Sequence, residues 1–198
     1  MVAADGHPTS LGEWTSGAAW STIKVPLAVA ALRAGVCAPV GPVIVHSDND
    51  AAETLWSCLG DEAARQVQSV IREAGDPTTV VESRRLRAQY TPFGQTQWSL
   101  VDQARFAAGL PQIPDASPIV ELMGQLCTEH RWGLAAKGYA AKGGWGPGLN
   151  GDYLVRQFGM VSDVGVALAA ELHHAGYDAG VEIVDKLADW VVDRLTQQ

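Results

Sequence analysis

Ser21 and Lys24 are the first residues along the sequence whose types and spacing could do chemistry together. They stand three positions apart, so on a helix their side chains lie on one face near the same turn. Residues 25–32, which follow, carry no charge and predict a helix that is buried on nearly every side. Burial disfavours the charged form of an amine, so Lys24 could accept a proton from the Ser21 hydroxyl. The pair is a candidate nucleophile and base; the alternative is a helix-capping serine with a lysine that reaches solvent.

Two further motifs carry polar groups in suggestive order. Ser47-Asp48-Asn49 precedes a predicted helix, and Lys142-Gly143-Gly144 lies in a strand-like segment. At average composition, a Ser-Asp-Asn triplet has an expectation of roughly a few hundredths in a chain of this length. The chain has four lysines, and two of them fall in these motifs. The alternative for the first triplet is a cluster of helix N-cap residues, because all three residue types cap well.

Taken together, the three motifs resemble the S-x-x-K, S-D-N and K-T-G signature of class A β-lactamases and penicillin-binding proteins. The strand pair and the helix that follow the third motif also resemble the end of those proteins. The sequence is therefore identified as resembling a divergent, shortened member of the serine β-lactamase/penicillin-binding protein superfamily over most of its length. The resemblance implies an acyl-enzyme mechanism. No cofactor is expected, and the cysteines and histidines of the sequence do not have the spacing of metal ligands.

Carried over residue by residue, the resemblance implies three catalytic side chains. Ser21 would attack a strained lactam or a peptide carbonyl, and Lys24 would help to activate it. Ser47 would relay a proton towards the leaving nitrogen. The backbone N–H groups of Ser21 and Trp145 would form an oxyanion hole, whose donors are worth a few kcal/mol each.

The same resemblance implies a set of substrate-binding residues. Asn49 would bind the substrate amide, and Lys142 would place positive charge near Ser47 and a substrate carboxylate. Gly144 and Trp145 would line the site along the strand. Arg156, on the next strand, could supply charge for a carboxylate, or it could be a surface cation at a strand edge.

Several features depart from the family pattern. Gly143 stands where a hydroxyl residue should hold the substrate carboxylate, which places penicillin-like recognition in doubt. The loop at 82–98 offers only Glu82 as a base for the deacylating water, and the expected role of Glu82 is instead that of a loop-entry partner for Arg84 or Arg85. Without that base, hydrolysis of the acyl-enzyme should be slow. The short spacing between Ser21 and Ser47 implies a reduced helical lobe.

Periodicity and turn residues predict the elements that would position these groups. Helices are expected over 21–34, 50–59, 61–74, 99–110, 117–128 and 179–196. Strands are expected within 1–14, around an Asp5-Gly6 turn, and at 139–145, 153–161 and 164–172, with Thr15-Ser16-Gly17 as a loop. The prediction is one α+β domain, 1–198, with an antiparallel sheet of about five strands (about 1–14 and 138–172) flanked by helices. The helical lobe would span about 21–130.

Composition narrows the function further. The hydrophobic fraction of 47% and the net charge of -8 fit a globular protein and argue against nucleic acid as a partner. No apolar run is long enough for a transmembrane segment, and residues 1–5 do not resemble a signal peptide. Three cysteines suggest one disulfide with a free thiol, or three buried thiols. The family resemblance suggests an extracytoplasmic protein whose leader is absent from this chain; a cytoplasmic location is the alternative.

Three functional hypotheses follow. The first is a serine hydrolase of β-lactamase-like fold that forms an acyl-enzyme through Ser21 and turns over lactams poorly. The second is a D,D-peptidase-like or esterase-like enzyme that acts on cell-wall or small acyl substrates, which the missing loop glutamate favours. The third is a non-catalytic ligand-binding module of the same fold.

Overall fold

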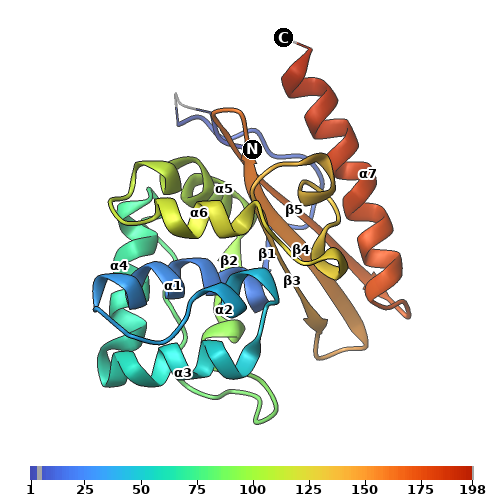
Figure 1. The fold of residues 1–198 in the computed structure, drawn as a ribbon. Helices are drawn as coiled ribbons and strands as arrows, with labels where there is room; N and C mark the ends of the chain where they lie inside the picture. Colours follow the sequence, from blue (N-terminus) through green and yellow to red (C-terminus); the bar gives the residue numbers. More distant parts are fainter. Residues whose placement is uncertain (4–5, 198) are drawn as a thin grey trace.

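A three-stranded antiparallel sheet forms one half of the computed structural model, which describes residues 1–3 and 6–197. Its strands are β3 (Ala141–Pro147), β4 (Asp152–Val161) and β5 (Val164–His173), in the order β3-β4-β5. The C-terminal helix α7 (Tyr177–Thr196) covers one face, and α5 (Leu100–Gly109) packs against the other (Figure 1). Alternation along β4 explains this arrangement, because successive side chains of a strand point to opposite faces.

The other half is a helical lobe built around α1 (Lys24–Arg33). Every residue from Lys24 to Ala31 is buried, as expected for a helix that is apolar nearly all round. It ends before Gly35, whose φ of +67° suits glycine. Around α1 lie α2 (Gly41–Val45), α3 (Asn49–Leu59), α4 (Ala63–Glu73) and α6 (Ser117–Met123).

A small second sheet connects the two halves. Strand β1 (Ser16–Ala18) pairs antiparallel with β2 (Gln97–Ser99) and leads directly into the 3₁₀ turn η1 (Trp20–Ile23). η1 lies against β3, so the start of α1 meets the edge of the main sheet. Further 3₁₀ turns are η2 (Gly60–Glu62), η3 (Phe93–Gln95), η4 (Leu110–Gln112), η5 (Thr128–His130) and η6 (Ala135–Lys137).

The α+β fold with antiparallel sheets flanked by helices is confirmed, but its strands are distributed differently from the prediction. Among the residues that the structure describes, five strands divide into sheets of three and two. In the described part of 1–14 there are two isolated β-bridges and no regular strand: Val2 pairs with Pro8 and with Gly165. Pro8 lacks an N–H, and Gly6 and Gly12 have φ of +76° and +83°, so regular strands do not form. Asp5, half of the predicted turn, lies outside the described residues.

Three local predictions are also wrong. Ser16 and Gly17, expected in a loop, belong to β1, whose partner β2 lies about 80 positions away along the chain. The helix expected over 117–128 ends at Met123, because the Cys127 N–H donates to Val45 O instead of continuing the helix. The three cysteines are free thiols, and none is fully buried.

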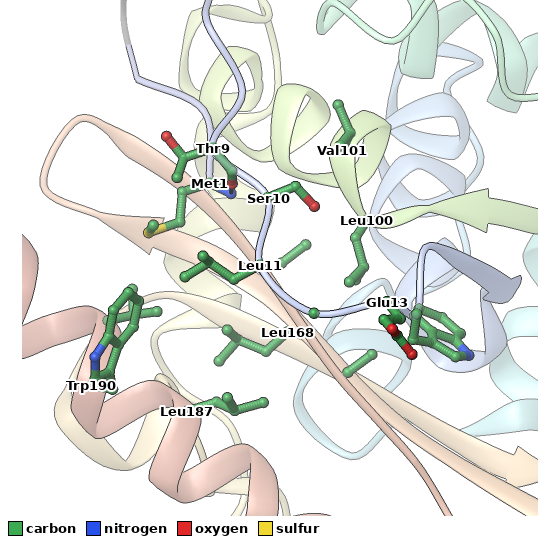
Figure 2. A pocket seen from close by; sticks show the side chains of 15 residues that line it. Met1, Thr9, Ser10, Leu11, Glu13, Leu100, Val101, Leu168, Leu187 and Trp190 are labelled. Atoms are coloured by element: carbon green, nitrogen blue, oxygen red, sulfur yellow. Dashed lines mark hydrogen bonds between the residues drawn. The ribbon is translucent and has the colours of Figure 1, made fainter.

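An apolar pocket of about 290 Å³ lies between the N-terminal segment, β5 and α7. Figure 2 shows Leu11 over the middle of this pocket, with Leu168 beneath it and Leu187 and Trp190 on the α7 side. Leu11 and Trp190 are 63% and 44% exposed. The pocket shares no lining residue with the cleft described below.

Candidate active site

A cleft of about 500 Å³ lies where the helical lobe meets the edge of the main sheet. Residues of the first two motifs surround it, together with Trp145, which follows the third motif, and with the segment 89–94. Its lining residues are Trp20, Ser21, Lys24, His46, Ser47, Asn49, Asp50, Glu53, Gln89, Tyr90, Thr91, Gly94, His130 and Trp145.

Ser21 opens into this cleft from η1, the turn before α1. The residue before it, Trp20, has a φ of +49°, which is uncommon for a residue with a side chain. Such backbone strain is concentrated at functional sites. A side-chain capping hydrogen bond is absent at the start of η1 and of α1, so in this described part of the chain Ser21 is not a capping serine.

Lys24 points into the lobe from the first turn of α1 and is 1% exposed. Its Nζ donates to the backbone oxygen of Ser47 and, at 2.6 Å, to Oδ1 of Asn49. Burial lowers the Lys24 pKa from 10.5 to about 7, and the charge of Asp48 opposes this shift. Lys24 therefore does not reach solvent, in contrast to the alternative considered from the sequence.

Ser47 lies between the two lysines. Its Oγ accepts a hydrogen bond from Lys142 Nζ at 2.8 Å and lies 3.4 Å from Lys24 Nζ. Ser47 also has a φ of +52°. Only Asp48 of its triplet caps α3, through a 2.9 Å bond from Ala51 N to Oδ1. Within the triplet, Asp48 therefore caps α3, whereas the side chains of Ser47 and Asn49 accept hydrogen bonds from the lysines.

Lys142 is buried beneath the cleft on β3. Its Nζ also donates to Gly143 O at 3.0 Å. Burial is the main reason that its pKa lies well below 10.5, and the charge of Lys24 adds to the effect. Ser47 therefore bridges two amines whose charged forms are both disfavoured.

The two glycines after Lys142 allow close packing on opposite faces of β3. A Cβ on Gly144 would lie 2.8 Å from Ser21 N and 2.9 Å from Ala19 O. A Cβ on Gly143 would lie 2.5 Å from the Trp132 ring. Gly144 thus lets β3 approach η1, the turn that carries Ser21, whereas Gly143 makes room for the Trp132 indole.

Arg156 does not reach the cleft. It is 0% exposed and donates to Gly17 O, Trp98 O and Gln103 Oε1 at 2.9–3.1 Å. Burial lowers its pKa to about 9. Neither the predicted contact with a substrate carboxylate nor the surface alternative describes Arg156, which joins β4 to the small sheet.

Glu82 also lies away from the cleft lining. Its carboxylate accepts bonds from the backbone N and the guanidinium of Arg84 at 2.8–3.1 Å. These bonds lower its pKa to about 2. Glu82 therefore binds Arg84, one of the two arginines expected from the sequence to be its partner.

The structure adds residues that the sequence did not single out. His130 lines the cleft with its ring centroid 5.2 Å from that of Trp145, and Cys127 Sγ lies 3.3 Å from its Nδ1. Burial and the charge of Lys142 lower the His130 pKa. Asp50 and Glu53 line the cleft from α3. Their positions three and six residues beyond Ser47 on a predicted helix could have suggested this placement.

The described residues contain no group of three or more His, Cys, Asp or Glu side chains placed to hold a metal ion. Within the same residues, no helix is long and apolar enough to span a bilayer.

Comparison with known proteins shows which solved structures have a similar fold. No protein-family model and no curated protein sequence matches the chain. Among solved structures, the β-lactamase from Sphaerobacter thermophilus matches with a TM-score of 0.71 at 17% identity, over 100% of this chain and 90% of that one. The chain has a β-lactamase/transpeptidase-like fold.

Two other structures with this fold differ in what they represent. The TLA-1 extended-spectrum β-lactamase gives a TM-score of 0.77 at 12% identity, over 98% of this chain and 90% of that one. A mutant of PBP-A, solved as an acyl-enzyme complex with penicillin G, gives 0.68 at 19% identity, over 100% and 89%. At these identities the β-lactamase-like likeness concerns the fold alone.

Proposed function

We propose that this protein is a serine acyl hydrolase that forms an acyl-enzyme through Ser21 and hydrolyses it slowly. The observation that carries the proposal is the Ser47 hydroxyl, which bridges Lys24 and Lys142 in the cleft that Ser21 lines. Two buried amines beside a candidate nucleophile supply acceptors for its proton without any cofactor.

In the first step, Ser21 Oγ attacks the carbonyl carbon while its proton passes to the neutral amine of Lys24. At a pKa of about 7 roughly half of this amine is neutral at pH 7, against a negligible fraction for an exposed lysine. The N–H groups of Ser21 and Trp145 would stabilise the oxyanion. Asn49 would hold the acyl amide.

In the second step, the bond from the carbonyl carbon to the leaving group breaks. The leaving atom takes the electron pair and receives a proton from the Ser47 hydroxyl, which is restored from the lysines. The acyl group remains on Ser21 until water attacks it. This role requires Lys142 to stay within hydrogen-bond distance of Ser47, as it is at 2.8 Å.

Slow hydrolysis follows from the lining of the cleft. The segment 89–94 contributes Gln89, Tyr90, Thr91 and Gly94 but no carboxylate. Of the two carboxylates that line the cleft from α3, Glu53 is paired with Arg85 at 2.9 Å. No described loop residue is therefore placed to activate water, and this favours peptidase-like or esterase-like turnover over efficient lactam hydrolysis.

The test is covalent labelling followed by intact mass measurement. The protein is incubated separately with a fluorescent penicillin and with an uncharged alkyl fluorophosphonate, from which a serine oxygen displaces fluoride. A Ser21→Ala variant should lose the adduct, whereas Ser69→Ala, which changes an exposed serine on α4, should keep it. Absence of a Ser21 adduct with both reagents would refute the proposal and favour a binding module.

An extracytoplasmic site of action is part of the same proposal. Fractionation of cells that express the protein would test it.

A further inference from the structure

The charges at the mouth of the cleft are mainly negative. Asp50 is exposed and Glu53 is half-buried, and both line the cleft. The cation among the described lining residues, Lys24, is buried and directs its Nζ to Ser47 and Asn49. Glu53 is paired with Arg85, so an anionic group that enters this cleft meets the exposed Asp50 carboxylate before it meets a free cation of the lining.

The nearby arginines are already engaged. Arg156 is bound inside the sheet. Arg87 donates to Pro147 O at 2.7 Å, and its guanidinium lies over the Tyr90 ring at 4.4 Å. Arg85 is paired with Glu53. None of the three belongs to the described lining, so no arginine there is available to pair with a substrate carboxylate.

A hydroxyl next to Lys142 is also excluded by packing. Any side chain at position 143 would place its Cβ 2.5 Å from Trp132, a ring that is 5% exposed. A buried indole cannot rotate aside as a flexible side chain can. Gly143 is thus matched to Trp132, whose ring occupies the space that a hydroxyl-bearing side chain at position 143 would need.

On this side the cleft is lined by the Trp145 ring, which neighbouring aromatic rings hold in place. The Trp145 ring lies 4.9 Å from Tyr177 and 6.2 Å from Trp132, measured between ring centroids. His130 packs on it from the cleft side of η5 and is held by Cys127. Trp145 is also the residue whose N–H would serve the oxyanion, so this wall stands beside the reacting carbonyl.

We infer that the cleft takes esters or amides that carry no carboxylate next to the scissile bond and that present an aromatic group to Trp145. The inference rests on the proposed function and names its substrate class. In the reaction, Ser21 Oγ bonds to the carbonyl carbon, and the bond from that carbon to the aryl oxygen or nitrogen breaks. The leaving atom keeps the electron pair and gains a proton, and water later releases the acid.

A matched pair of esters tests the charge preference. 4-Nitrophenyl acetate and 3-carboxy-4-nitrophenyl acetate differ by one carboxylate, and each rate is normalised to hydroxide hydrolysis of the same ester. We expect kcat/KM for the neutral ester to be about tenfold higher. Asp50→Asn should narrow the ratio several-fold, because it removes a charge from the lining. Asp61→Asn, which removes an exposed charge on η2 outside the lining, should not.

A second comparison tests the aromatic wall. Trp145→Ala keeps the backbone N–H but removes the ring, so KM should rise for 4-nitrophenyl acetate and not for 2,2,2-trifluoroethyl acetate, an activated ester without an aromatic group. Equal changes for the two esters would contradict the role of the ring.

The possible outcomes distinguish a failure of this inference from a failure of the proposed function. Equal or faster Ser21-dependent hydrolysis of the carboxylate ester would overturn the inference and leave the proposed function standing. If neither ester is hydrolysed in a Ser21-dependent manner and no Ser21 adduct forms with the fluorophosphonate, both are wrong.

Discussion

Replacing Gly144 with alanine tests whether the close approach of β3 to η1, the turn that carries Ser21, sets the geometry of the proposed reaction. The added Cβ would lie 2.8 Å from Ser21 N, 2.9 Å from Ala19 O and 3.0 Å from Thr22 N. All three are backbone atoms of one tight turn, so none can move aside by a change of rotamer. β3 and η1 must therefore separate, and with them the two N–H groups proposed to bind the oxyanion.

The expected magnitude follows from these contacts. Overpacking of this kind typically costs about 1–3 kcal/mol of the free energy of unfolding. Misalignment of one oxyanion donor typically costs about 10²–10³-fold in rate. Gly144→Ala should therefore reduce Ser21 acylation far more than stability alone would explain. Urea unfolding gives the first quantity, and the rate of acyl-adduct formation with 4-nitrophenyl acetate, measured per folded molecule, gives the second.

Gly41→Ala is the matched control. Gly41 begins α2, and a Cβ added there would meet no heavy atom within 4 Å, so alanine should be neutral or stabilising by up to about 1 kcal/mol. Acylation should remain unchanged in this variant. A Gly144→Ala protein that acylates at the wild-type rate per folded molecule would refute the link between β3 placement and the reaction, whatever its stability.

Four further predictions concern Lys24, the bridging serine and the buried arginine. Acylation should accelerate as pH rises through about 7, because only neutral Lys24 accepts a proton; a rate profile without an inflection between about pH 6 and 8, one unit either side of the Lys24 pKa, would contradict this. Between pH 7 and 10.5, Lys24 is neutral in the folded protein but protonated in the unfolded chain, because burial lowers its pKa only in the folded state. Lys24 should therefore make the free energy of unfolding rise with pH over that range, and urea titrations of the wild type and of Lys24→Met would measure this contribution. Ser47→Ala should slow acylation by about 10²–10⁴-fold, because it removes the proposed proton relay. The free energy of unfolding should fall by about 1–3 kcal/mol, because buried Lys142 loses an acceptor. An unchanged rate in ester assays would exclude the relay role of Ser47. Arg156→Met should lower the free energy of unfolding by about 3 kcal/mol or more, because several buried acceptors lose their donor. The ratio of kcat/KM for the neutral ester to that for the carboxylate ester should stay unchanged. A change in this ratio would indicate that Arg156 contributes to substrate binding.

Local signals were sufficient for much of the fold. The uncharged run after Lys24, the glycine at position 35 and the Ser99 cap of α5 each act within a few residues, and helices form there as predicted. The strands β4 and β5 and helix α7 follow in the same way from periodicity. The small β1-β2 sheet could not be predicted, because its pairing depends on a partner far along the chain.

The candidate site shows the same division between local and distant information. The family resemblance brought Ser21, Lys24, Ser47, Asn49 and Lys142 forward, and four of these five line one cleft while the fifth binds Ser47 from below. Their roles as catalytic and binding groups stay predictions.

Arg156 was misjudged because charge alone does not say which face of β4 a residue occupies. Its neighbours on that face are backbone carbonyls of β1 and β2, an environment that exists only once those strands pair.

The departure at Gly143 is explained only by a residue eleven positions earlier. Trp132 fills the space that a side chain at position 143 would need, so the two positions are physically coupled. Substituting threonine at 143 alone would therefore force the buried indole to move, at a cost typical of overpacking, about 1–3 kcal/mol. Only with Trp132→Ala does the added hydroxyl have room, although that change also opens a cavity at a cost of about 3–5 kcal/mol.

The arrangement of the two lysines explains why the cleft can accept a proton at all. The charge of Lys24 contributes to the lowered pKa of Lys142, so protonating one amine disfavours protonating the other. Burial works in the same direction at both amines. A network that cannot easily hold two positive charges keeps one amine neutral near pH 7, and Ser47, bonded to one amine and 3.4 Å from the other, gives a proton a short path between them. In the proposed reaction, the proton that Ser21 loses therefore has an acceptor within the protein, and it is the burial of the two lysines that makes a neutral acceptor available.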